Sequence, residues 1–185
     1  IWGSREERID AAYQFFFYTL IGSFFLLIGI LIILNETGST NFSIILNYKF
    51  NSNLQLILFL CFFMGFAIKI PIFPFHIWLP KAHVEAPTAG SVILAGILLK
   101  LGGYGFIRFA ITMFPYGCFY FSKVVITLSL VSIFYCSFII LSQVDLKRII
   151  AYSSIIHMNF AILGLITLNP QALQGSIYLM LAHGL

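Results

Sequence analysis

The stretch 66-FAIKIPIFPFHIWLPKAHVEAPTAGSVILAGILLKLGGYGFIRF-109 decides the fold of this chain. It contains two apolar segments, each long enough for a helix, and a proline-rich segment between them. Each apolar segment carries one lysine, Lys69 in the first and Lys100 in the second. A lysine near the centre of a membrane-spanning helix costs about 3 kcal/mol. A chain that keeps two such lysines is expected to use them.

Composition identifies the chain as an integral membrane protein. Hydrophobic residues make up 61% of its 185 residues and charged residues 9%, whereas soluble domains average about 25% charged residues. The net charge of +4 is spread over the loops without a basic face, which argues against nucleic acid as a partner. Cys61, Cys118 and Cys136 are isolated, which favours buried apolar residues over disulfide or metal chemistry.

Five segments are long enough to cross a bilayer, which takes about 20 apolar residues, and a sixth begins. The expected spans are 11–34, 54–79, 88–114, 124–142, 149–168 and 172–185, the last cut off, with loops between them. The predicted fold is an all-α polytopic membrane bundle, a single transmembrane domain over residues 1–185. The chain begins without Met and stops inside an apolar run, so we expect it to be an internal fragment of a larger protein.

The loops alternate between the two sides of the membrane, and their charges differ. The loops at 1–10, 80–87 and 143–148 carry five Lys or Arg residues, and those on the other side carry three. The positive-inside rule therefore places the first set on the matrix or cytoplasmic side.

Four titratable residues lie about midway along their spans: Lys69, Lys100, His157 and His183. Because consecutive helices are antiparallel, these four side chains are expected at one membrane depth, as a lateral row. Burial favours the neutral form of a lysine, so a buried lysine can exchange its proton when a neighbour's charge changes. Histidine titrates near neutral pH without help. The alternatives are that the histidines are only hydrogen-bonded packing residues, and that the lysine side chains extend toward the membrane–water interface.

Two prolines break the second span. Pro71 and Pro74 have no N–H, so the carbonyls of Ala67 and Ile70, on either side of Lys69, are expected to lack helical partners. Irregular backbone survives at membrane depth only where protein or water satisfies it, and discontinuous helices form ion sites in transporters. The alternative is that the two prolines only kink the helix and form no ion site.

Further polar residues follow the break. His76 comes seven residues after Lys69, on the same face if the helix resumes, and is a candidate group for proton uptake or release. Trp78 is expected to mark the membrane interface, and His83 and Glu85 to lie in a loop, where a solvated structural role is at least as plausible.

Small and hydroxyl residues accompany the deeper polar groups. Ala89, Gly96 and Gly103 recur every seven residues, which lets a neighbouring helix approach Lys100 closely. Ser153 lies four residues before His157, so its hydroxyl shares the histidine's helix face. LGGYGF at 101–106 lacks the Lys-Ser/Thr ending of a phosphate loop. We predict neither catalytic residues nor a metal site in this chain.

The strings KIPIFPFHIWLPKAHVEAPTAGSVILAGILLKLGGYGFIRF (69–109), DLKRIIAYSSIIHM (145–158) and LMLAHGL (179–185) closely resemble one family. It is the chain 4 family of mitochondrial NADH:ubiquinone oxidoreductase, respiratory complex I, whose members are related to Mrp-type antiporter subunits. The resemblance covers nearly the whole chain, least of all the loop at 35–53.

The resemblance implies a bundle of about fourteen helices with two inverted repeats, each containing a broken helix, and a polar axis along the membrane. In that scheme Lys69 is the lysine of the first broken helix, Lys100 that of the following helix, and His157 and His183 are histidines of the axis. His76 matches the family histidine after the break. The family's acidic partners lie before Ile1 and after Leu185.

The resemblance also implies a location and partners. It places the chain in the mitochondrial inner membrane, among the membrane-arm subunits of complex I, neighbouring antiporter-like subunits and lipids. The chain itself would bind no cofactor, and NADH, FMN, iron–sulfur clusters and ubiquinone would act in other subunits. Two alternatives remain: a stand-alone Mrp-type cation/proton antiporter subunit, and a membrane scaffold whose polar residues only lock helices together.

Overall fold

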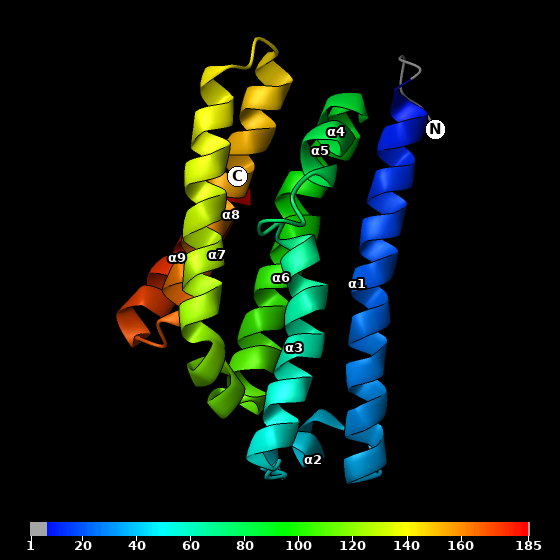
Figure 1. Ribbon diagram of the computed structural model, residues 1–185, viewed down its shortest axis with the longest axis vertical. Coiled ribbons are helices and arrows are strands. Elements are labelled where there is room, and N and C mark those ends of the chain that lie inside the picture. The colour runs from blue at the N-terminus through cyan, green and yellow to red at the C-terminus, as the bar shows by residue number, and fades with distance from the viewer. Residues whose placement is uncertain (1–6, 185) are drawn as a thin grey trace.

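The computed structural model describes residues 7–184, which form an all-helical bundle without strands (Figure 1). Five of its helical segments are long and apolar enough to cross a membrane. The elements in chain order are α1 (Arg8–Thr37), α2 (Phe42–Asn47), α3 (Ser52–Lys69), α4 (Trp78–Glu85), α5 (Thr88–Ile93), the π-helix η1 (Leu94–Leu98), α6 (Leu99–Gly105), the π-helix η2 (Phe106–Ile111), α7 (Pro115–Leu141), α8 (Leu146–Ile166) and α9 (Pro170–Gly184).

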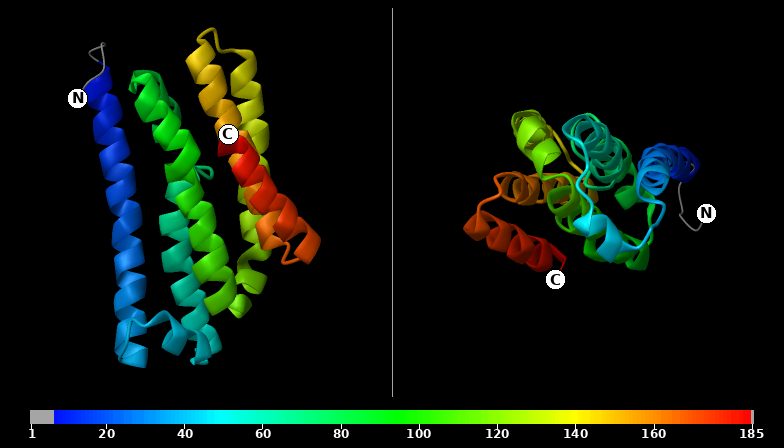
Figure 2. Two further views of the ribbon diagram at one scale, coloured as in Figure 1. Left: turned by 180° about the vertical axis from the view of Figure 1, so that it is seen from behind. Right: turned by 90° about the horizontal axis from the view of Figure 1, so that it is seen from below.

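The long helices alternate in direction, as their loops predicted. The start of α1, the junction of α4 with α5 and the turn from α7 to α8 share one end of the bundle, and α2 lies at the other (Figure 1). Helix α3 packs against α1, α6 and α7, while α8 packs against α4, α7 and α9. Helix α9 runs obliquely, and its last residues return toward the middle of the bundle beside η1 (Figure 2).

Three predicted boundaries are wrong. The second span ends at Lys69 rather than at residue 79, because residues 70–77 are not helical, so that Lys69 ends a helix instead of lying within one. The expected loop at 80–87 is mostly helix α4. The expected turn at 115–123 is the first part of α7, whose first residue is Pro115. A proline is tolerated at that position, because the N–H it lacks has no partner within the helix.

The backbone at the break after Lys69 is partly paired, and among residues 7–184 the Ile70 carbonyl has no hydrogen-bond donor, as predicted. The Ala67 carbonyl, expected to be free, accepts a hydrogen bond from the Ile72 N–H at 2.9 Å. The Ile68 carbonyl accepts one from the indole Nε1 of Trp78 at 3.0 Å. Trp78 is 2% exposed, so its indole ring braces the break from inside the bundle.

Candidate functional site

Lys100 and His183 form the closest polar contact among the predicted site residues. Lys100 Nζ lies 2.6 Å from His183 Nδ1, although the two residues are 83 positions apart in sequence. Lys100 Nζ also donates to the Ala95 carbonyl at 2.5 Å. An ammonium group has three donors and no acceptor, so it donates to Nδ1, and the proton of the neutral imidazole is then on Nε2.

Local helix geometry creates this site. In an α-helix the Leu99 N–H would bond to the Ala95 carbonyl, but in the π-helix η1 it bonds to Leu94, five residues back. The Ala95 carbonyl is therefore available to the Lys100 side chain. The facing helix comes close because Gly96 meets Gly184: a Cβ on Gly184 would lie 3.4 Å from the Gly96 oxygen. The expectation that small residues hold Lys100 against a neighbouring helix is confirmed.

His157 extends the same cluster. Its ring centroid lies 5.8 Å from that of His183, with the two rings tilted by 55°. Thus α6, α9 and α8 each contribute one titratable side chain to a row, in which Lys100 and His183 are half-buried and His157 is exposed. Ser153 does not join it, because its hydroxyl donates to the Ile150 carbonyl of its own helix. We call Lys100, His183 and His157 the axis cluster.

Lys69, the fourth residue of the predicted row, lies apart. It is half-buried at the end of α3, and within residues 7–184 its ammonium has no hydrogen-bond or ion-pair partner. Its Cβ lies beside Gly102, where an added Cβ would be 3.3 Å away. The structure therefore places Lys69 against α6 but does not connect it to the axis cluster.

His76 lies in the non-helical segment, so it does not share a helix face with Lys69, contrary to expectation. The side chain is 4% exposed and packs against the rings of Phe73 and Tyr135, at centroid distances of 5.7 and 5.4 Å. Its Nδ1 has no partner among the described residues. His76 is thus a buried imidazole at the break.

Two residues at the break were not among the predicted site residues. Asn159 of α8 donates from Nδ2 to the Pro71 carbonyl at 3.4 Å, and Ser132 of α7 accepts a hydrogen bond from the Phe73 N–H at 2.5 Å. Both are buried. Asn159 could have been found by the criterion that identified the lysines, which is a strongly polar side chain inside an apolar span.

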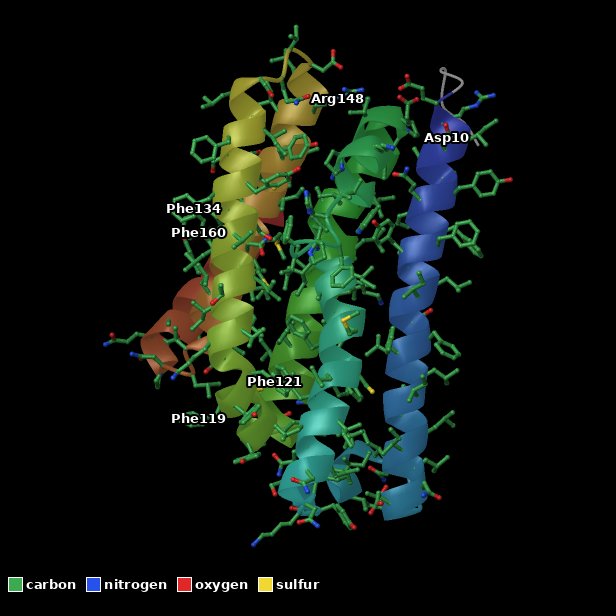
Figure 3. The ribbon with its side chains drawn as sticks, in the orientation of Figure 1. Asp10, Phe119, Phe121, Phe134, Arg148 and Phe160 are labelled. Atoms are coloured by element: carbon green, nitrogen blue, oxygen red, sulfur yellow. The ribbon has the colours of Figure 1, made fainter. Side chains whose placement is uncertain are left out.

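His83 was expected in a solvated loop, but it is 7% exposed and its Nε2 has no partner among residues 7–184. Burial lowers the pKa of His83, and the nearby Lys147 ammonium lowers it further. The adjacent Val84 and Glu85 line a polar cavity of about 440 Å³ at this end of the bundle. Asp10 and Arg148 also line it, and both lie at the same end in Figure 3.

Comparisons with known proteins agree on one family. The transmembrane family model described as NADH:quinone oxidoreductase/Mrp antiporter matches residues 1–185. NADH-ubiquinone oxidoreductase chain 4 of Marchantia polymorpha and of Triticum aestivum are each 57% identical over all 185 residues. The chain spans 37% of the length of each of these two relatives.

Solved structures share the fold. A chain of respiratory complex I from Thermus thermophilus with bound NADH superimposes with a TM-score of 0.91 at 33% identity, covering 100% of this chain and 40% of that one. A chain of the Mrp complex from Dietzia sp. gives 0.87 at 24% identity, covering 98% of this chain and 20% of that one, a likeness of fold alone. The chain therefore belongs to the NADH:quinone oxidoreductase/Mrp antiporter transmembrane family.

Proposed function

We propose that this chain is part of a proton-translocating membrane subunit of NADH:ubiquinone oxidoreductase. The observation that carries the proposal is the axis cluster, in which three apolar helices bring the half-buried Lys100 and His183 and the exposed His157 into one row. The names of the 57% identical relatives support the assignment to this enzyme. The chain has no role in the redox chemistry itself.

The cluster can pass a proton along its length. A proton leaves Lys100 Nζ as the bond from Nδ1 of His183 to that proton forms, which makes the imidazole an imidazolium. The imidazolium then releases its Nε2 proton toward His157, and a new proton restores Lys100. The remaining His183 proton returns from Nδ1 to Nε2 before the next transfer. Each step is triggered by a change of charge nearby, because the preferred protonation state of a buried group depends on its neighbours' charges.

Lys69 and His76 complete the proposed pathway on the side of the helix break. Pro71 and Pro74 interrupt the helix there and leave an irregular segment between the two residues. Lys69 has a free ammonium among the described residues, and His76 has a free Nδ1. Redox energy released elsewhere in the enzyme would change the charge at one end of this pathway.

The family membership also supports a location and partners. We propose that the chain is an internal part of a subunit of about fourteen helices in the mitochondrial inner membrane, where it spans the membrane several times. Its neighbours would be the other membrane-arm subunits, including antiporter-like ones. NADH, FMN, iron–sulfur clusters and ubiquinone would be bound by other subunits.

A stand-alone cation/proton antiporter subunit is the second candidate, because the chain shares its fold with the Mrp complex. The two candidates predict different assemblies. Native gel separation of gently solubilised source membranes, with in-gel NADH dehydrogenase staining and mass spectrometry, distinguishes them. We expect peptides of this chain in a very large band that oxidises NADH. Their recovery only in a smaller band without that activity would favour the antiporter.

A further inference from the structure

An apolar cavity of about 340 Å³ lies between α1, α3 and η2, at the end of the bundle where α2 lies (Figure 1). Its walls include Leu26 of α1, Phe62 and Phe66 of α3, and Phe109 of η2. Among the described residues that line it, Thr40 is the only polar one. Ligand pockets in proteins typically enclose about 300–1,000 Å³ and are mostly apolar. The cavity therefore has the size and the lining of a site for an apolar group.

Packed aromatic rings keep the cavity open. The ring centroids of Phe62 and Phe66 are 5.9 Å apart, those of Phe62 and Phe109 6.3 Å, and those of Phe109 and Phe42 5.9 Å. Helix α1 already touches this wall, because a Cβ on Gly29 would lie 2.8 Å from the Phe62 ring. The two helices therefore cannot move closer together to fill the cavity.

Arg108 supplies a positive charge at the edge of this cavity. Its guanidinium carbon lies 4.1 Å from the centroid of the Phe42 ring, and Phe42 lines the cavity. The Arg108 side chain is exposed, and among residues 7–184 it has no acidic partner and no hydrogen-bond acceptor. A guanidinium presents five N–H donors in a planar fork that fits the oxygens of a phosphate. Arg108 is therefore available to a phosphate group beside the cavity.

The cavity and Arg108 lie at different depths of the bilayer. Arg108 is near the end of the span Thr88–Ile111, where long basic side chains extend toward the level of the lipid headgroups. The cavity extends inward along α1 from Ile33 to Leu26, a rise of about 10 Å. A charged group at the interface, with apolar space on its inner side, matches a phospholipid that places its phosphate at the surface and an acyl chain inside.

The charge at this end of the bundle favours an anionic lipid. The loops and helix ends there carry Lys49, Arg108 and Lys123 against one acidic residue, Glu36. We propose that the chain binds an anionic phospholipid here, with one acyl chain in the cavity and the phosphate on Arg108. The bound lipid completes the packing of α1 against α3. None of the axis-cluster residues lines the cavity, so the inference is independent of the proton pathway.

The test uses the assembled membrane enzyme, stripped of loosely bound lipid in detergent. It is mixed with phosphatidylglycerol that carries a photoreactive diazirine on one acyl chain, and the labelled peptides are mapped by mass spectrometry. Phosphatidylcholine with the same acyl chain is the zwitterionic comparison. A further sample contains an excess of inorganic phosphate, which has the charge of the headgroup but no acyl chain.

Two variants probe the two parts of the site. Arg108→Gln removes the charge, and Ile30→Phe places a larger side chain at a lining residue that is 44% exposed. The matched controls are Lys49→Gln, at a basic residue of the same end, and Leu31→Phe, at a residue that is 53% exposed and does not line the cavity. Native gels measure the assembly of each variant.

In the unaltered enzyme we expect phosphatidylglycerol to label the cavity wall more strongly than phosphatidylcholine does, and inorganic phosphate to leave the labelling in place. Arg108→Gln should lower the labelling by phosphatidylglycerol about 10-fold, the usual effect of losing a hydrogen bond to a charged group. Ile30→Phe should lower the labelling by both lipids. Lys49→Gln and Leu31→Phe should match the unaltered enzyme.

Absence of label at the cavity wall in the unaltered enzyme would overturn the inference, and would mean that another part of the subunit or a neighbouring subunit fills the cavity. Equal labelling by the two lipids, or loss of label to inorganic phosphate alone, would also overturn it. These comparisons need no variant, so they decide the question even if Arg108→Gln does not assemble. Undiminished labelling in assembled Arg108→Gln would contradict the role of the guanidinium.

Discussion

Lys100 is positioned by a defect in its own helix as much as by its neighbours. A regular α-helix would bond the Ala95 carbonyl to Leu99, and the lysine would have to share that acceptor. The π-turn therefore supplies an unshared backbone oxygen to a half-buried ammonium. The ammonium has three N–H donors, and its contacts with Ala95 and His183 use two of them.

The lowered pKa of His83 predicts how the stability of the protein changes with pH. Its pKa is lowered by burial and by Lys147, whose ammonium donates to the carbonyls of Val84 and Ala86 at 3.4 and 3.2 Å. A histidine whose folded pKa is depressed stabilises the fold above its ordinary pKa of about 6.5, and this stability is lost as the pH falls through the folded value.

We expect Lys147→Met to raise the pKa of His83 and so to reduce the loss of stability on acidification. The measurement is the melting temperature of the purified assembly across about pH 5 to pH 8. Lys123→Met, at the other end of the bundle, is the control and should leave the pH dependence unchanged. An unchanged pH dependence in Lys147→Met would contradict the coupling between Lys147 and His83.

The roles of single residues were predictable from sequence where a polar side chain lies in an otherwise apolar span. Lys100 and the two histidines of the axis cluster stand out in apolar spans, and the structure joins them. The burial of His83 was not predictable, because it depends on α8 packing against α4, a contact between segments about 60 residues apart. The roles of Asn159 and Ser132 at the break depend on the same kind of distant contact.

At the scale of elements, the contact of α6 with the end of α3 depends on glycine. A Cβ on Gly102 would overlap the side chain of Ile70 and approach Lys69 Cβ to 3.3 Å. The absence of a side chain at Gly102 thus allows the break to lie directly against α6.

Gly102→Val should force these two elements apart and destabilise the protein by about 1–3 kcal/mol, the usual cost of overpacking. Thermal unfolding and the yield of assembled enzyme measure this effect. Gly175→Ala is the matched control, because nothing lies within 4 Å of a Cβ at that helical position. It should be neutral or stabilise the helix by up to about 1 kcal/mol. Equal stability of the two variants would contradict the proposed packing.

The long membrane-spanning elements followed from hydropathy and proline, but their ends did not, and the short helices α2 and α4 lie where loops were expected. The prolines predicted a break near Lys69, and the structure contains one. The irregular segment extends to residue 77 because Trp78, Ser132 and Asn159 satisfy its backbone from outside, which no local pattern reveals. Pro115 was interpreted as a turn, although a proline at the start of a helix is equally compatible with the sequence.

At the scale of the whole molecule, the outer surface carries many large apolar side chains. Phe119 and Phe134 on α7 and Phe160 on α8 are 74%, 63% and 51% exposed, and their side chains point outward (Figure 3). In water such a surface would drive aggregation. It suits lipid or neighbouring subunits, while Lys100 and His183 lie half-buried between η1, α6 and α9.

The most direct test compares Lys100→Ala with Lys123→Ala, a change at an exposed lysine in the first part of α7, in NADH-oxidising membranes. The measurement is the number of protons translocated per NADH oxidised, with assembly checked on a native gel. We expect Lys100→Ala to assemble and to lose most or all of its proton translocation, while Lys123→Ala retains it. Normal proton translocation by assembled Lys100→Ala would contradict the role assigned to the axis cluster.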